Sequence, residues 1–125
     1  MPDNAHRDIA VDFLQLAASG KARQAFERYV SPGFVHHNAW FPGDGPSLMK
    51  AMDENAAQNP DKELKIHRVV EDGDQVATFS HVKHKRGDPG AAVVHFFRFE
   101  GDQIAELWDV GQEVPAASPN KNGMF

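Results

Sequence analysis

The sequence predicts an α+β fold in which three helices come first along the chain and a mainly antiparallel sheet follows. Apolar residues recur at helical spacing only before Pro60, where the periodicity changes. After Pro60 the chain divides into four apolar runs that are separated by short turn signals. Because connections this short join antiparallel neighbours, the four runs are expected to form a meander, with the helices covering one of its faces.

The first helix is expected to start at an N-cap, Asp3 or Asn4, and to end at Ser19-Gly20. Both cap residues carry a side-chain oxygen that can accept from the free N–H groups of the first turn. The apolar positions that recur at helical spacing along this segment are Ile9, Phe13, Leu16 and Ala17.

A second helix is expected from about residue 21 to residue 29, where Ser31-Pro32-Gly33 ends it. Residues 34–41, with the sequence FVHHNAWF, form a short extended stretch that is expected to be a loop covering another part of the molecule. A third helix begins at Ser47 and stops at Asn59-Pro60.

The four strands are expected at residues 63–71, 75–84, 91–100 and 103–112. The run 91–100 has apolar residues on both of its faces. One face can therefore fill the core and the other an interface, which predicts a homodimer formed through the sheet.

Length and composition favour a single domain, residues 1–125, with a loop-like tail from about residue 113. The net charge is −5, and the densest basic run, residues 83–86, is expected to be a solvated loop tip, so no nucleic-acid partner is predicted. No run of 18 apolar residues and no secretory leader is present, so we expect a cytoplasmic protein without a membrane partner. The lack of cysteine excludes a disulfide framework and a thiol nucleophile.

The last two strands carry a histidine and a carboxylate, His95 and Asp109, and each is flanked by apolar residues on both sides. Folding the hairpin at residues 100–103 can bring the two face to face. Desolvation should raise the pKa of Asp109 toward a value that suits a base. The alternatives are an aspartate that accepts from backbone amides and a histidine that is an ordinary core residue.

Strand register decides whether these side chains share a face. If the turn at residues 86–90 is centred near Asp88, His81 lies opposite His95. A three-residue turn at Gly101–Gln103, or a bulge, then adds Asp109 to the same row, whereas a two-residue turn without a bulge sends Asp109 to the other face. The prediction is the three-residue turn or a bulge.

No metal and no cofactor are predicted. A row of His81, His95 and Asp109 could resemble a facial ligand set, but no helical His-x-x-x-His or cysteine-supported cluster exists. Phosphate-binding and dinucleotide-binding fingerprints are missing, and so is a Gly-x-Ser-x-Gly elbow.

Four pieces of the chain resemble the nuclear-transport-factor-like, cone-shaped superfamily, and more narrowly its SnoaL-like group of polyketide cyclases and predicted aldol-condensation proteins. They are Tyr29, residues 34–38, residues 97–112 and residues 122–125. The resemblance implies a strongly curved sheet wrapped around the helices, a cone with one deep pocket, and frequent homodimers. The superfamily also hosts isomerases, dehydratases and proteins with no known reaction, so the fold does not define the activity.

The resemblance also implies roles for particular residues. In cyclases of this kind an aspartate near the end of the last strand is the acid–base catalyst, with a histidine on the preceding strand, and Asp109 and His95 match those places. His37 and Asn38 occupy the characteristic His-Asn position, where they could stabilise an enolate oxygen, unless they form an Asx-type turn with an exposed histidine. Further candidates for binding the substrate are Trp40, Phe41 and Trp108 as pocket walls and Gln112 as a polar contact.

The leading hypothesis is therefore a cofactor-independent acid–base enzyme for a small, largely apolar carbonyl compound, with a SnoaL-like aldol condensation or cyclisation as its reaction. Asp109 would move the proton, His95 and His81 would orient the carboxylate or share its proton, and the substrate would be the only small-molecule partner. One alternative is a non-catalytic ligand-binding or dimerisation module of the same fold. Another is an isomerase like ketosteroid isomerase, or a dehydratase.

Overall fold

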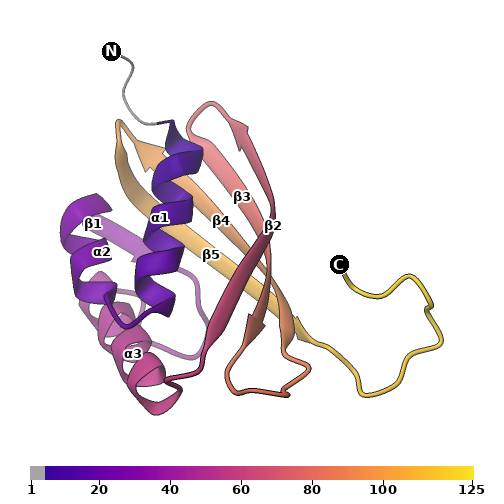
Figure 1. The fold of residues 1–125 in the computed structure, drawn as a ribbon. Helices are drawn as coiled ribbons and strands as arrows, with labels where there is room; N and C mark the ends of the chain where they lie inside the picture. Colours follow the sequence, from indigo (N-terminus) through magenta and orange to yellow (C-terminus); the bar gives the residue numbers. More distant parts are fainter. Residues whose placement is uncertain (1–4) are drawn as a thin grey trace.

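Three helices pack on one face of a five-stranded sheet in the computed structural model, which describes residues 5–125 (Figure 1). In chain order the elements are α1 (His6–Ala18), α2 (Ala22–Tyr29), β1 (Val30–His36), α3 (Gly45–Gln58), β2 (Glu63–Asp72), β3 (Gln75–Lys83), β4 (Ala91–Glu100) and β5 (Gln103–Glu113). The sheet curves around α1, and the predicted α+β class is confirmed.

The helices begin and end close to where the sequence places them. The expected cap of α1, Asp3 or Asn4, lies outside the described residues, and the helix starts after Ala5. The start of α3 comes two residues before the expected Ser47, because Asp44 is its N-cap and accepts from the backbone N–H of Ser47 at 2.8 Å. No helix within residues 5–125 has the length and apolar character needed to cross a membrane.

The strands follow the order β1-β5-β4-β3-β2, and the four from β2 to β5 form the expected antiparallel meander. The prediction was wrong for β1. Ser31-Pro32-Gly33 does not end a helix in a turn but lies inside an edge strand that pairs in parallel with β5. Proline is tolerated there because an edge strand leaves some of its N–H groups unpaired.

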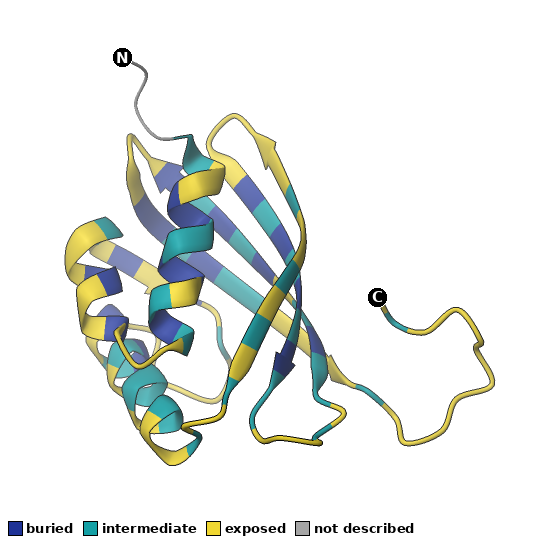
Figure 2. Cartoon of the chain, in the orientation of Figure 1, coloured by how far each residue is buried: buried dark blue, intermediate teal, exposed yellow. Residues whose placement is uncertain are grey.

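The core lies between the inner face of the sheet and the helices, and the buried positions of the strands face α1 in Figure 2. Phe13 of α1 contacts Phe97 of β4 edge to face, with ring centroids 6.0 Å apart. The other members of the buried cluster are Ile9, Ala10, Leu14, Ala25, Phe26, Phe34, Leu48, Val76, Phe99, Ile104 and Leu107. Two members of this cluster, Leu14 and Leu48, also line the pocket described below, so the core borders the site directly.

The β4–β5 hairpin has the register that the sequence predicted. His95 pairs directly with Asp109. The turn itself has only two residues between Glu100 and Gln103, and the register shifts by one beyond Phe99, so that Ala105 is an extra residue in β5. This β-bulge restores Asp109 to the inner face.

The β3–β4 register differs from the prediction. Thr78, not His81, lies opposite His95, and His81 pairs with Ala92. His81 is therefore on the outer face, where its Nε2 donates to the carbonyl of Pro89 at 2.7 Å. The three-strand row of His81, His95 and Asp109 does not exist.

The reason for this difference is the path of the turn, which is centred between Arg86 and Gly87 rather than near Asp88. Gly90 has a φ of +80°, and a Cβ at this position would lie 2.3 Å from the carbonyl oxygen of Val82. Only glycine fits such a close approach of two backbones. The composition of residues 86–90 therefore does not show where the centre of the turn lies, and this centre sets the register of β3 with β4.

Candidate active site

A pocket of about 590 Å³ opens between the helices and the inner face of the sheet. Its walls are mostly apolar, and its polar side chains come from the loop after β1, from α3, from the residues just before β2 and just after β3, and from β4 and β5. The polar residues that line it are His37, Asn38, Asn55, Lys62, His84, His95 and Asp109. An apolar pocket with a few converging polar groups is the usual form of a small-molecule site.

His95 and Asp109 face each other across β4 and β5 at the pocket wall. No hydrogen bond joins them. Instead, Asn38 donates from Nδ2 to Oδ2 of Asp109 at 3.0 Å. Within residues 5–125 no donor reaches Oδ1 of Asp109, so this oxygen is free to accept a proton from a bound ligand.

His95 is buried, and burial lowers its pKa to about 4, although the nearby carboxylate of Asp109 acts in the opposite direction. The positive charge of Lys62 lowers it further. At neutral pH the ring is therefore uncharged and holds one N–H donor and one acceptor nitrogen. Its Nδ1 is buried and makes no hydrogen bond with residues 5–125.

The loop after β1 holds Asn38 in place. His36 is buried, donates from Nε2 to the carbonyl of Pro42 at 2.6 Å, and accepts from the backbone N–H of Asn38 at Nδ1, 3.1 Å away. The side-chain oxygen of Asn38 accepts from the N–H of Trp40 at 3.0 Å. Because this oxygen is occupied, the amide of Asn38 can only present its N–H group to Asp109.

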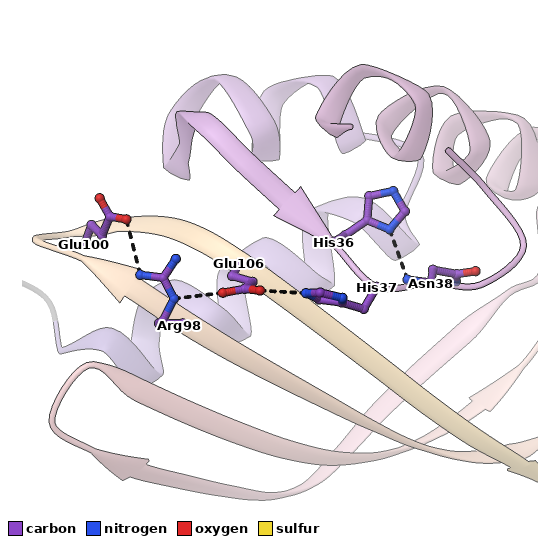
Figure 3. Close-up of polar contacts among 6 residues, drawn as sticks. All are labelled: His36, His37, Asn38, Arg98, Glu100 and Glu106. Atoms are coloured by element: carbon purple, nitrogen blue, oxygen red, sulfur yellow. Dashed lines mark hydrogen bonds and ion pairs between the residues drawn. The ribbon is translucent and has the colours of Figure 1, made fainter. Parts of the chain in front are cut away.

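His37 lines the pocket mouth, within the reach that the sequence suggested, but its Nε2 is bound to Glu106 instead of being free for a substrate oxygen. Figure 3 shows His36 and His37 on different sides of the chain, with His37 directed toward Glu106. Its Nε2 donates to Glu106 at 2.6 Å, and its ring stacks on Trp108 with centroids 4.8 Å apart. His37 and Arg98 lower the pKa of Glu106, and Arg98 also binds Glu100 at 3.2 Å. His37 thus belongs to an outer-face network and reaches the pocket lining only at its mouth.

The other candidates for substrate binding divide into two groups. Trp40 and Phe41 line the pocket, but Trp40 is 87% exposed, so the pair lies at the pocket mouth. Trp108 is on the outer face, where it contacts Phe96 edge to face. Gln112 is exposed and outside the pocket lining. The prediction that Trp108 and Gln112 line the pocket was therefore wrong. Side chains alternate between the two faces of β5, and both of these residues lie on the face opposite to Asp109.

Sequence reasoning missed three polar residues of the pocket, Asn55, Lys62 and His84. His84 was expected at a solvated loop tip, but it is half-buried directly after β3. Lys62 is half-buried and donates from Nζ to the side-chain oxygen of Asn55 at 2.7 Å. Nothing in the polar segment around Lys62 distinguishes it from a solvated turn.

Among residues 5–125, no three histidine, aspartate or glutamate side chains are arranged to hold a metal ion. The row of His81, His95 and Asp109 that could have resembled a facial ligand set is absent, because His81 lies on the outer face.

A family model described as a SnoaL-like domain matches residues 10–107. No curated protein matches the chain.

Solved structures share the fold at low sequence identity. IdmH from Streptomyces antibioticus, a proposed polyketide cyclase, is 18% identical with a TM-score of 0.70, and the match covers 87% of this chain and 93% of IdmH. An NTF2-like protein of unknown function from Cytophaga hutchinsonii is 15% identical with a TM-score of 0.71, over 89% and 93% of the two chains. A proposed ketosteroid isomerase from Kribbella flavida is 16% identical with a TM-score of 0.70, over 93% and 84%.

Proposed function

The chain belongs to the SnoaL-like domain family, and we propose that it is an acid–base enzyme that removes a proton next to a carbonyl group in a small, largely apolar substrate. The observation that carries this proposal is the facing pair of His95 and Asp109 at the wall of an apolar pocket, with one carboxylate oxygen held by Asn38 and the other free. A fixed carboxylate beside a neutral imidazole can move a proton without a cofactor.

In the proposed reaction, Oδ1 of Asp109 accepts the proton from the carbon next to the substrate carbonyl, and the electron pair of that C–H bond forms an enolate. The neutral ring of His95 can donate its N–H to the oxygen on which the charge develops. The enolate carbon then attacks a second carbonyl of the same substrate, which closes an aldol ring. Asp109 returns its proton to the new alkoxide, so the protein is unchanged at the end of the cycle.

This assignment changes the role that the sequence suggested for Asn38. Its N–H group is used by Asp109, so it positions the base instead of stabilising the enolate oxygen. His37 has its Nε2 bound to Glu106 and takes no part in the proposed steps.

Deuterium exchange tests the proposal without knowledge of the natural substrate. Acetophenone and 2-tetralone are incubated with the protein in D₂O, and loss of the proton signal next to the carbonyl is followed by NMR. We expect exchange about 10²-fold or more above the buffer rate, which is the usual contribution of a general base. Binding of these ketones without accelerated exchange would favour the non-catalytic binding module.

An isomerase or dehydratase would begin with the same proton transfer, and one of the structures that share the fold is named as a ketosteroid isomerase. The products separate these reactions from a cyclisation. An isomerase returns the proton to another carbon of the same compound, a dehydratase releases water, and an aldol cyclase forms a new carbon–carbon bond.

We also propose that the outer face of the sheet forms a homodimer. Val94 and Val110 pair directly across β4 and β5, and they are 39% and 71% exposed. Next to them Phe96 and Trp108 form a second outward pair. Two adjacent apolar pairs on an open sheet face are typical of an interface.

Val110→Lys is expected to convert a dimer into a monomer, because it places a charge in the exposed apolar pair that Val110 forms with Val94. Sedimentation of the wild-type protein and the variant gives the two masses. Gln24→Lys, which adds the same charge to the exposed surface of α2, is the control and should stay dimeric. A monomeric wild type, or a dimeric Val110→Lys, would exclude this interface.

A further inference from the structure

Lys62 provides a positive charge in the wall of the pocket. It precedes β2, lines the main pocket, and also borders a smaller cavity of about 330 Å³. Its Nζ donates to Oδ1 of Asn55 at 2.7 Å. An ammonium group has three donors, so two remain for a ligand after the bond to Asn55.

Lys62 makes no ion pair with a carboxylate among residues 5–125. Burial lowers the pKa of its amine, because the charged form has lost part of its hydration without a compensating negative charge. A half-buried cation in this situation gains more from an incoming anion than an exposed surface lysine does.

The position of Lys62 relative to the base sets the shape of a ligand that reaches both. Lys62 immediately precedes β2 and Asp109 is on β5, with β3 and β4 between these two strands. Three strand spacings correspond to roughly 14 Å across the sheet. Lys62 is also displaced along the strands, because its neighbour Glu63 pairs with Lys83 whereas the row of Asp109 crosses β3 at Thr78. The pocket wall between them includes the apolar Leu64, Val82 and Val93, one from each of β2, β3 and β4, and its polar members are His84 beside Lys62 and His95 beside Asp109. The wall is thus cationic at one end, apolar in the middle and basic at the other end.

We propose that Lys62 anchors an anionic group, a carboxylate, at the end of the substrate remote from the reacting carbonyl, so that the substrates are keto acids with an apolar middle segment. This inference deepens the proposed function and rests on it for the identity of the carbonyl end. The distance between Lys62 and Asp109 keeps the ligand carboxylate away from the carboxylate of the base. A keto acid bound in the reverse orientation would bring two negative charges together, so Lys62 also sets the direction of binding.

Binding of matched ligands tests the charge of the substrate independently of any reaction. The probes are aryl keto acids of increasing chain length, from 3-benzoylpropanoate to 5-benzoylpentanoate, and their uncharged primary amides. Isothermal titration with the full chain at neutral pH gives the two dissociation constants of each pair. We expect the best keto acid to bind about tenfold or more tightly than its amide, since a partly buried charged hydrogen bond is worth at least that factor.

Two variants assign this preference to one residue. Lys62→Met keeps the aliphatic stem and should bind acid and amide equally, whereas Lys62→Arg keeps the charge and should retain the preference. Lys65→Met removes an exposed lysine of β2 that lies outside the main pocket, and this variant should behave like the wild type. A thermal melt of each variant shows that the fold is intact.

Equal affinity of acid and amide for the wild type, or a preference that survives in Lys62→Met, would overturn the anchor. So would the lack of binding by every keto acid at millimolar concentration. Because the readout is binding, a preference for acids that depends on Lys62 supports the anchor even if no deuterium exchange occurs. In that case the proposed function alone has failed.

Discussion

Asp109→Asn is expected to lower the rate of deuterium exchange by about 10²- to 10⁴-fold while leaving the affinity for ketones and the stability almost unchanged. The asparagine has nearly the same shape, and its amide oxygen can still accept from Nδ2 of Asn38. It cannot accept the substrate proton, because a neutral amide is a far weaker base than a carboxylate. The NMR exchange rate and a ligand titration on the same sample separate catalysis from binding.

Asp72→Asn is the matched control, since Asp72 is an exposed aspartate at the end of β2, away from the pocket. Its exchange rate should equal that of the wild type. If Asp109→Asn keeps full exchange activity, Asp109 is not the base. If it loses affinity or stability together with activity, the carboxylate has a structural role.

His95 is expected to make the protein less stable in acid. Its pKa is about 4 in the folded chain against 6.5 in the unfolded one, so the unfolded state binds more protons between these two values. The free energy of unfolding should therefore rise with pH through this window and fall as the pH drops from 6.5 toward 4. At about 1.4 kcal/mol per pKa unit, the contribution of His95 amounts to about 3 kcal/mol.

Urea unfolding at several pH values between 4 and 7 measures this contribution. His95→Gln has no titrating ring and should lose about 3 kcal/mol of the pH dependence relative to the wild type. His67→Gln is the control, because His67 is exposed on β2, and its pH dependence should match that of the wild type. The same slope in wild type and His95→Gln would show that His95 is not buried in its neutral form.

The predicted elements were accurate where periodicity and turn chemistry agreed. The three helices and the four strands after Pro60 end within two residues of their expected limits, because glycine, proline and asparagine mark the breaks between strongly periodic segments. β1 was missed because Pro32 and Gly33 are typical of turns. At a sheet edge the pairing with β5 outweighs that local preference.

The sequence predicted the pairing of His95 with Asp109 correctly but not the position of His81, and the difference lies in the turns that set the two registers. The pairing of His95 with Asp109 depends on one short hairpin, whereas the place of His81 depends on a longer turn whose centre the composition does not define. The direction of His37 could have been predicted. Phe34 and His36 are both buried, so alternation along an extended chain places His37 on the other side. Lys62 had no such signal, since only the tertiary fold brings it to the pocket.

The bulge at Ala105 determines which face of the sheet each later side chain of β5 occupies. The single extra residue sets the phase of every later side chain, so that Asp109 faces inward and Trp108 outward. At the low identity that separates this chain from structures of the same fold, an alignment gap placed one residue away exchanges these two positions. Comparison of this hairpin between relatives therefore has to follow strand pairing, and an acid one column away in an alignment can occupy the same place in space.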